Sequence, residues 1–451
     1  MTHDLSAARA DILHGRLSAA DAMAQSHSAA ASPAGTAAYL HRFDASAQAT
    51  AAAVDAQFGS GAPLPTLGGL AVSVKALFDV QGQVTTAASK VLADRPAATA
   101  DSLAVARLRQ AGAALGGHTH MTEFAYSGVG TNPHHPPLVN PVTLHVDGQA
   151  RVPGGSTSGG AASVAVGAAW AALGTDTGGS IRIPAALQGL VGFKNTARLT
   201  PLEGSVPLSP SLDVACALTL SVRDAVLLHE VLSGRRVRLP RRPVSSLRLA
   251  VPSTLVLDGL APEVAKAFEQ SLSVLRRAGA HVQDLPLPEL AELAQMNAAG
   301  GFAAAESWAW HRMLLSTRGG EYDPRVAARM RRGASMDAAD YIDLVRNRAD
   351  WIARMDRQLE PFDALLSPTV PVPAPLLSEV ETDEGFSAVN TLLLRNPSVV
   401  NFLDGCALSL PCHAPGQLPV GLMVWAGALH DDAVLDVSLT VEALLRTGGQ
   451  D

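Results

Sequence analysis

Short apolar runs of strand length alternate with helical patterns along much of the chain. Runs of this kind occur at 68–77, at 247–252 and in the stretches AALGGHTH and AALGTD. Helical patterns lie between them, among them a small-residue run after Ser158 and the segment 262–278. Strands that alternate with helices predict a largely parallel sheet with helices on both faces. The expected fold class is therefore α/β, with a large mixed, mostly parallel twisted sheet.

Other parts of the chain follow a more helical pattern. Residues 1–60 predict two or three alanine-rich helices, and residues 289–358 are helical in pattern almost throughout. Asp101 is the expected N-cap of a helix that ends at Gly112, and Ser180 is expected to begin another helix. No repeat or long linker divides the chain. We expect one domain over 1–451, with its core at 61–240 and a helical insertion at 289–358.

Composition excludes several classes of function. The 451 residues include 34 lysines and arginines against 41 acidic residues, and a net charge of −7 argues against nucleic-acid binding. The N-terminal sequence lacks the pattern of a signal peptide, and no apolar stretch is long enough to span a membrane. Three scattered cysteines do not make a disulfide framework. A cytoplasmic protein without a membrane partner is expected.

Two stretches rich in glycine and serine carry the candidate chemistry. PGGSTSGGAAS covers 153–163 and GTDTGGSIRIP covers 174–184, while Lys75 ends a strand-like run upstream. Ordered glycines cost backbone entropy, so such clusters are favoured where backbone N–H groups must approach another group closely. Two serines, a lysine and neighbouring glycine amides can provide a nucleophile, a proton relay and an oxyanion hole. The alternative for Lys75 is a solvent-facing lysine at a strand end.

These motifs, in this order and spacing, resemble the amidase signature family of hydrolases. The resemblance runs from about Gly68 to the segment GLMVWAGALHDDAVL and implies the amidase signature fold. Residue by residue, Ser180 resembles the family nucleophile, Ser156 the serine on a cis peptide bond, and Lys75 the base. The resemblance implies that Gly155–Ser156 or Ser156–Thr157 is cis, and we favour the first. It also implies an acyl-enzyme that cleaves an amide, an ester or a carbamate, with no cofactor.

Residues around the three motifs have expected supporting roles. The backbone N–H groups of Thr177, Gly178 and Gly179, together with that of Ser180, sit at a predicted helix start and can stabilise an oxyanion. Asp176 is expected to hold this turn with Arg182 as its partner, and Ser158 is a further supporting residue. The alternative for Asp176 and Arg182 is a surface ion pair.

The segment MTEFAYSGVGTN resembles the family segment that lines the acyl side of the pocket. It makes five residues candidates for substrate binding: Met121, Thr122, Glu123, Phe124 and Tyr126. The helical residues 300–350 are expected to cover this pocket. The expected partner is a small-molecule amide, and the chain is expected to be a monomer or a homodimer.

Other interpretations of the sequence are weaker. The histidines between 118 and 135 (His118, His120, His134 and His135) lack the spacing of a zinc site, so no metal is expected. A second function on the same fold is the ammonia-releasing component of a tRNA-dependent transamidation complex. A third is a non-catalytic binding protein, which would not need Lys75, Ser156 and Ser180 together.

Overall fold

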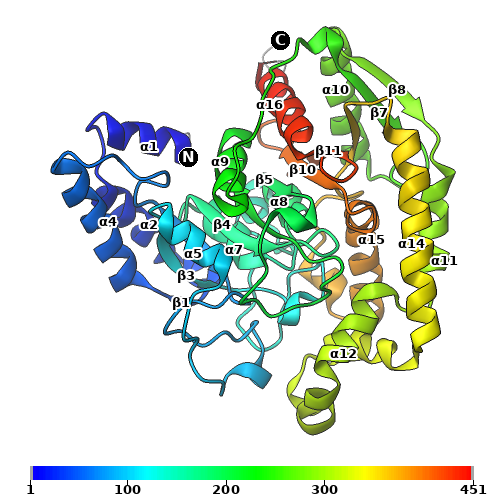
Figure 1. The fold of residues 1–451 in the computed structure, drawn as a ribbon, viewed down its shortest axis with the longest axis horizontal. Coiled ribbons are helices and arrows are strands. Elements are labelled where there is room, and N and C mark those ends of the chain that lie inside the picture. Colours follow the sequence, from blue (N-terminus) through cyan, green and yellow to red (C-terminus); the bar gives the residue numbers. More distant parts are fainter. Residues whose placement is uncertain (1–3, 448–451) are drawn as a thin grey trace.

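The computed structural model describes residues 4–447, and the eleven strands of this region form one sheet (Figure 1). The strand order is β1-β3-β2-β4-β6-β5-β10-β11-β9-β7-β8. The strands are β1 Tyr39–Arg42, β2 Ala71–Lys75, β3 Ala114–Thr119, β4 Ala171–Thr175, β5 Val191–Lys194, β6 Ala215–Thr219, β7 Arg248–Pro252, β8 His281–Leu285, β9 Ala364–Pro368, β10 Cys406–Pro411 and β11 Gly421–Ala426.

Helices surround the sheet on both sides. The α-helices are α1 Leu5–Leu13, α2 Ala19–Ala30, α3 Pro33–Ala38, α4 Asp44–Gly59, α5 Leu103–Gln110, α6 Pro141–Asp147, α7 Ser158–Ala165, α8 Arg182–Gln188, α9 Val222–Ser233, α10 Pro262–Arg277, α11 Leu293–Met296, α12 Gly301–Arg318, α13 Pro324–Arg331, α14 Ala338–Leu359, α15 Asp383–Phe402 and α16 Asp431–Thr447. Short 3-10 helices are η1 Lys90–Leu92, η2 Glu123–Ala125, η3 Ala197–Leu199, η4 Val244–Ser246, η5 Pro288–Glu292, η6 Gly319–Glu321, η7 Arg332–Ser335 and η8 Leu377–Val380.

The expected α/β fold with a large mixed sheet is confirmed, and its parallel strands lie in two groups. β3, β2 and β4 run parallel on one flank, and β9, β7 and β8 on the other. The other neighbouring pairs in the described sheet are antiparallel. The antiparallel centre of the sheet could not be predicted from the sequence, because the central strands are buried on both faces. They therefore show the continuous apolar runs that are typical of parallel strands.

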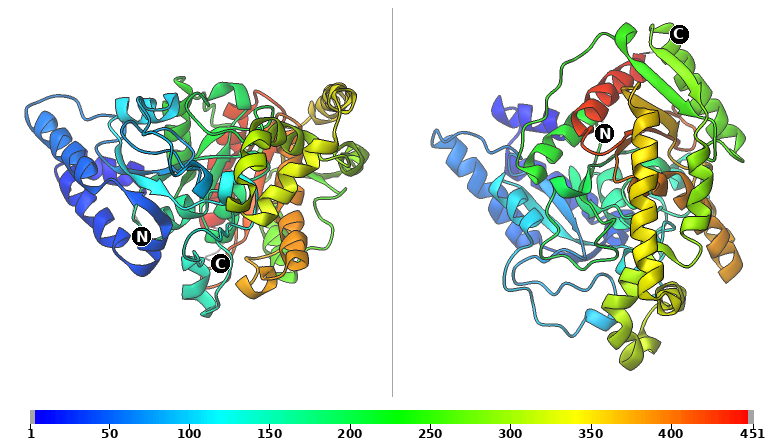
Figure 2. Two further views of the ribbon diagram at one scale, coloured as in Figure 1. Left: turned by 90° about the horizontal axis from the view of Figure 1, so that it is seen from below. Right: turned by 45° about the vertical axis from the view of Figure 1, so that its right-hand side comes forward.

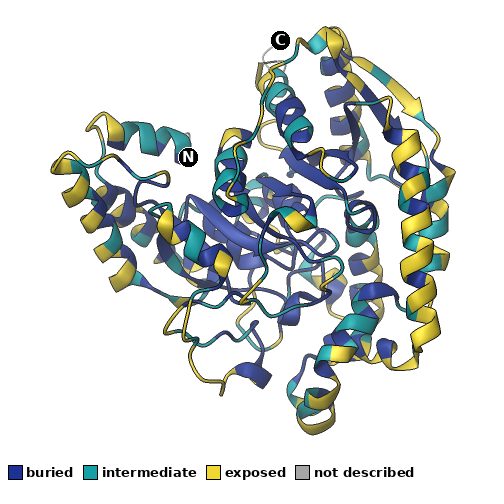
Figure 3. Ribbon diagram, in the orientation of Figure 1, coloured by how far each residue is buried: buried dark blue, intermediate teal, exposed yellow. Residues whose placement is uncertain are grey.

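Alternate residues of the central strands enter two different cores. On β11, Leu422 and Val424 pack with apolar residues of α10 and α16, whereas Met423 and Trp425 pack with residues of α14 and α15. Successive strand residues point to opposite faces, so this division places helices on both sides of the sheet. Figure 3 shows the result: the strands are buried, and exposure concentrates on the outer sides of helices such as α14.

The N-terminal region is more elaborate than the sequence suggested. Residues 4–60 form four helices, and the short strand β1 pairs antiparallel with β3 at the sheet edge. A four-residue strand gives too little alternation to be recognised among helical patterns. A second correction concerns α5, whose N-cap is Ser102 and not Asp101, because the Ser102 hydroxyl accepts the N–H of Val105. Asp101 instead pairs with Arg109.

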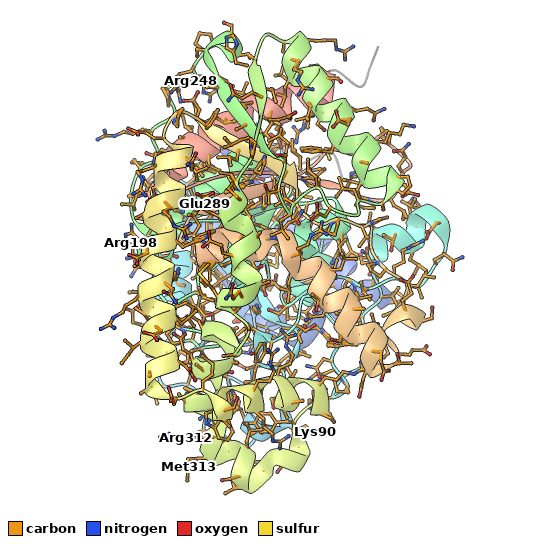
Figure 4. All side chains as sticks on the ribbon, turned by 90° about the vertical axis from the view of Figure 1, so that its right-hand side faces the viewer. Lys90, Arg198, Arg248, Glu289, Arg312 and Met313 are labelled. Atoms are coloured by element: carbon orange, nitrogen blue, oxygen red, sulfur yellow. The ribbon has the colours of Figure 1, made fainter. Side chains whose placement is uncertain are left out.

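The helical segment expected at 289–358 is present and lies at the opposite end of the molecule from α1, α2 and α4 (Figures 1 and 2). Its longest helix, α14, is anchored by Trp351, whose indole is fully buried and donates to the Glu289 carbonyl. Arg312 and Met313 of α12 project from the outer end of this segment (Figure 4), and Met313 is 70% exposed. No helix between residues 4 and 447 has the length and apolar character of a membrane span.

The expected helix after Ser180 is shorter than the sequence suggested. The helix α8 begins at Arg182 and ends at Gln188, and residues 191–194 form β5 in the middle of the sheet. Gly189 separates them with a backbone φ of +67°, a left-handed conformation that suits glycine. The apolar run alone did not reveal this change because helix and buried strand share such runs.

Candidate active site

Lys75 is a fully buried lysine at the end of β2. Its Nζ lies 2.8 Å from the Ser156 Oγ and 2.9 Å from the Thr175 Oγ1, and its exposure is 0%. β2 pairs with β3 on one side and β4 on the other, so its last residue projects into the interior. Burial lowers the pKa of Lys75 to about 7 because the charged form loses its hydration. The solvent-facing alternative is therefore wrong.

Ser156 lies in a tightly packed loop before α7. The Gly155–Ser156 peptide bond is cis, as favoured from the sequence. A Cβ atom on Gly155 would come within 2.7 Å of the Gly130 nitrogen, which explains why glycine is required there. The Ser156 carbonyl accepts the N–H of Thr122 at 3.2 Å, and its hydroxyl accepts from Lys75. The loop thus fixes the hydroxyl beside the buried amine.

Ser180 lies in the turn between β4 and α8. Its carbonyl accepts the N–H of Thr157 at 3.2 Å, which joins this turn to the loop that carries Ser156. Ser180 lines a cavity of about 490 Å³. The tertiary structure thus brings the two glycine-and-serine-rich stretches and Lys75 together, and of Lys75, Ser156 and Ser180 it is Ser180 that lines the cavity.

The turn before Ser180 offers fewer free amides than the sequence suggested. The Gly179 N–H donates to the Asp176 Oδ1 at 2.9 Å, so it already has an acceptor. This is a correction to its expected role in an oxyanion hole. Within residues 4–447, the N–H groups of Thr177 and Gly178 have no acceptor, and both residues line the cavity. Glycine suits position 179 because its φ is +126° and a Cβ there would meet Pro397 at 2.6 Å.

Asp176 and Arg182 form a buried ion pair and not a surface pair. The Arg182 Nη2 lies 2.9 Å from the Asp176 Oδ1, and both side chains are 0% exposed. Asn401 of α15 completes the cluster: it donates to Asp176 at 2.9 Å and accepts from Arg182 at 2.6 Å. Burial alone would raise the pKa of Asp176, but the pair with Arg182 holds it below its ordinary value. The carboxylate is thus ionised and clamps the turn.

Replacing Asp176 by asparagine is expected to destabilise the fold by about 3–5 kcal/mol, because Arg182 would keep a buried charge without a counterion. Urea unfolding monitored by circular dichroism measures the change. The matched control is Asp343→Asn, which removes the carboxylate of an exposed pair with Arg346 at 4.0 Å and is expected to cost less than about 1 kcal/mol. Equal losses in the two variants would contradict the structural role of the buried pair.

Asp213 is a site residue that the sequence analysis missed. Its carboxylate accepts from the Thr177 hydroxyl at 2.5 Å and from the N–H groups of Leu208 and Ser209 at 3.0 Å. Burial raises the pKa of Asp213 to about 6, and its charge acts to raise the pKa of Lys75. It thus links the turn before Ser180 to the buried lysine. The short motif SLD that contains Asp213 does not indicate a role in the site, because Asp213 contacts the site through a segment distant in sequence.

Replacing Asp213 by asparagine is expected to move the acid limb of the pH–rate profile to lower pH. Asp213 favours the charged form of Lys75, so its neutralisation lowers the lysine pKa and leaves more neutral amine at a given pH. The measurement is kcat/KM for a neutral amide between pH 5 and pH 9. An acid limb that stays in place, or moves upward, would show that Asp213 has no electrostatic effect on Lys75.

The cavity is formed by segments that are distant in sequence. From the stretch 121–126, only Tyr126 of the five expected binding residues lines it, together with the neighbours Ala125 and Ser127. Residues of the helical segment, among them Leu290 and Phe302, form another part of the wall, and α15 contributes Leu394.

The other four residues of that stretch point elsewhere. Met121 is fully buried in the core, and the Thr122 hydroxyl donates to the Ser127 carbonyl at 3.4 Å. Glu123 is fully buried and accepts from the Ser89 hydroxyl, while Phe124 packs edge-on against His311. The four are thus parts of the scaffold beneath the pocket, which the sequence could not separate from the lining because all lie in one short loop.

The histidines and Ser158 have structural partners. The ring nitrogen Nδ1 of His120 lies 3.0 Å from the Ser158 Oγ, which joins β3 to the start of α7. The Nε2 of His118 lies 3.1 Å from the Phe78 carbonyl, and that of His134 lies 2.9 Å from a Glu123 oxygen. Among residues 4–447, no three metal-ligating side chains gather at one point. Ser158, the first residue of α7, therefore has a structural role: its contact with His120 connects α7 to the segment that follows β3.

The chain matches known proteins over most of its length. A family model described as Amidase matches residues 23–435. A protein of Comamonas testosteroni named 2-amino-5-chloromuconic acid deaminase is 36% identical over 408 residues, which cover 90% of this chain and 87% of that protein. A glutamyl-tRNA(Gln) amidotransferase component from Acidobacterium capsulatum is 34% identical over 422 residues, covering 85% of this chain and 86% of that protein.

Solved structures agree with these matches. A crystal structure of an amidase superposes with a TM-score of 0.87 at 34% identity and covers 98% of this chain and 99% of that one. A chain of an inhibitor-bound complex, described as a vestigial protein complex that reveals the evolutionary origins of an s-triazine catabolic enzyme, gives a TM-score of 0.86 at 27% identity, with 98% of each chain covered. Because family pattern, relatives and fold agree over nearly the whole chain, it belongs to the amidase family of hydrolases that act on carbon–nitrogen bonds.

Proposed function

We propose that the chain hydrolyses a small-molecule amide through an acyl intermediate on Ser180, with Ser156 as proton relay and Lys75 as base. The Ser180 Oγ attacks the carbonyl carbon, its proton passes to Ser156, and the Ser156 proton passes to the Lys75 Nζ. The tetrahedral adduct expels the amine, which takes a proton back along the same route. Water then attacks the ester in the same way and releases the acid and free Ser180.

The contact between Lys75 and Ser156 is the observation that carries this proposal. A serine hydroxyl needs a neighbouring base, and a lysine acts as one only when its neutral form is populated. Burial lowers the pKa of Lys75 to about 7, and its Nζ lies 2.8 Å from the Ser156 Oγ. Thr177 and Gly178 line the cavity that Ser180 also lines, and their backbone N–H groups are the proposed donors to the oxyanion.

The proposed substrate is a small amide, with esters and carbamates as further candidates for the same chemistry. The cavity of about 490 Å³ is of the size that holds a small molecule. The eleven strands of the described region form one sheet, and we treat the chain as one catalytic domain whose segment 289–358 forms a wall of the site.

A second candidate is the glutamine-hydrolysing component of a transamidation complex. Relatives between 31% and 34% identical are named as components of glutamyl-tRNA(Gln) amidotransferase. This candidate requires glutamine as substrate and a complex with protein and tRNA partners. The stand-alone hydrolase requires neither.

The purified chain, without added cofactor, is tested on aryl amides, aliphatic amides, esters, carbamates and glutamine, with ammonia or amine release as the readout. Hydrolysis of small amides by the chain alone is the expected result. Activity on glutamine only, together with a larger mass in solution in the presence of partner proteins, would favour the second candidate. A folded chain that cleaves none of these compounds by itself would contradict the stand-alone hydrolase, and one that also fails to cleave glutamine in the presence of the partner proteins and tRNA would contradict both.

A further inference from the structure

The cavity beside Ser180 contains cations and no acidic side chain. Arg329, Arg332 and Arg395 line it, and none of its described lining residues is an aspartate or a glutamate. Much of the remaining wall is apolar: Leu208, Leu290, Leu293, Leu394, Phe302 and Phe402. A site of this composition favours a ligand with both an apolar part and a negative charge.

Arg329 is the most enclosed of these cations. It lies on α13, and its guanidinium carbon is 4.5 Å from the centre of the Tyr126 ring. Its Nη1 is buried and has no hydrogen-bond partner in the described part of the chain. Arg332, one helical turn further on, adds a second positive charge nearby. Burial raises the pKa of Tyr126, so the ring beneath Arg329 is a neutral phenol and supplies no counter-charge.

The buried, unpaired Nη1 of Arg329 distinguishes it from Arg182, the fully buried arginine of the site. Arg182 is fully buried, but it is paired with Asp176 and hydrogen-bonded to Asn401. A buried donor without an acceptor costs free energy, and a charged one costs more. An acceptor that arrives with a ligand removes this cost, and the planar guanidinium fork matches a carboxylate with two parallel hydrogen bonds.

We propose that the substrate is an amide that also carries a carboxylate, and that Arg329, assisted by Arg332, binds this carboxylate. The apolar wall then contacts the hydrocarbon segment that joins the carboxylate to the amide, and the amide carbonyl lies at Ser180. This inference rests on the proposed function, because it names the substrate class of the same site.

Arg395 is a weaker carboxylate site. It lies on α15, its Nη2 is buried without a partner, and its Nε donates to the Asn396 side chain at 3.0 Å. The charge of Asp258 acts on it and partly balances it. Tyr126 is the only group with an acidic proton that acts on Arg329 within residues 4–447, and no aspartate or glutamate does, so the carboxylate is assigned to Arg329.

The test compares matched substrates. Monoamides of dicarboxylic acids with four to six carbons are paired with neutral alkanamides of equal length, and kcat/KM is measured for each member of a pair. The wild-type chain is expected to prefer the acid member by about tenfold or more. Arg329→Met is expected to lower this acid-to-neutral ratio by about 10- to 100-fold, which is the effect of losing a hydrogen bond to an ionised group. Arg329→Lys, which keeps the charge but not the fork, is expected to recover part of the ratio.

Arg331→Met is the matched control, because Arg331 lies on the same helix, is exposed and does not line the cavity. It is expected to behave as the wild type. Labelling of Ser180 by an uncharged fluorophosphonate shows whether each variant is folded. Should Arg329→Met not fold, competitive inhibition of the wild type by dicarboxylates, against a neutral amide, tests the same charge preference.

A wild-type ratio near one, absence of dicarboxylate inhibition, or an unchanged ratio in folded Arg329→Met would overturn the inference while hydrolysis at Ser180 stands. Collapse of the ratio in Arg395→Met, with Arg329→Met unaffected, would overturn the assignment to Arg329. A wild-type chain that cleaves neither member of any pair and is not labelled at Ser180 would overturn the proposed function, and this inference with it.

Discussion

Ser180→Ala is expected to lower kcat/KM for amide hydrolysis by about 10⁴-fold or more, because no other hydroxyl is proposed to form the acyl intermediate. Loss of a serine nucleophile in well-studied hydrolases has effects of this order or larger, and the residual rate comes from binding and oxyanion stabilisation. Ser180 lines the cavity and lies in the turn that Asp176 clamps, so the substitution removes the nucleophile and leaves the surrounding contacts in place.

Covalent labelling provides a second readout of the same prediction. A fluorophosphonate is expected to add one label to the wild-type chain, mapped by mass spectrometry to the peptide that contains Ser180, and none to Ser180→Ala. Ser316→Ala, an exposed serine of α12, is the matched control and is expected to keep full activity and full labelling. A fully active Ser180→Ala enzyme would remove Ser180 from the mechanism.

Lys75→Ala is expected to lower the rate of acylation by about 10²–10⁴-fold, the usual contribution of a general base. Lys75→Arg is expected to fail almost as severely, because a guanidinium does not release its proton in the working pH range. In the wild type, kcat/KM is expected to fall as the pH decreases through about 7, where Lys75 becomes protonated and can no longer accept a proton. Stopped-flow measurement of the acyl step across this range tests the prediction.

Two lysines serve as controls. Lys90→Ala changes an exposed residue and is expected to leave the rate at the wild-type value. Lys194→Ala changes another buried lysine, whose Nζ donates to the carbonyls of Asn195 and Gly405, and is expected to lower stability. A Lys75→Arg enzyme with near-normal turnover would show that the lysine acts through its charge and that another group is the base.

Only the tertiary structure shows which residues of the segment 121–126 line the cavity and which belong to the surrounding scaffold. Met121 to Phe124 and Tyr126 belong to one short loop, but among these candidates only Tyr126 lines the cavity. The loop turns sharply, since Phe124 and Ala125 have positive φ angles of 50° and 60°. A turn of this kind reverses the direction of successive side chains, and no periodic pattern in the sequence reports it.

Long-range partners were also beyond the sequence. The Asp213 carboxylate accepts a hydrogen bond from the Thr177 hydroxyl. Asn401 bridges Asp176 and Arg182 from a helix more than two hundred residues further along the chain. Single polar residues in apolar segments carry no local signal of their partner. Arg329 is a similar case, because one arginine among several on a helix becomes distinctive only when the burial of its Nη1 and the lack of a partner for that atom are known.

The sequence by itself determined the class of fold and indicated which residues are proposed to carry the chemistry. Glycines at positions that tolerate no side chain, such as Gly155, and serines beside them form a local pattern, as does a strand-like run that ends in Lys75. The strand order, the antiparallel centre of the sheet, the burial of Lys75 and the shape and charge of the cavity were decided only by the tertiary structure. The physical reason is that local propensity and periodicity act over a few residues. Pairing, burial and electrostatic environment depend instead on segments that meet only when the chain is folded.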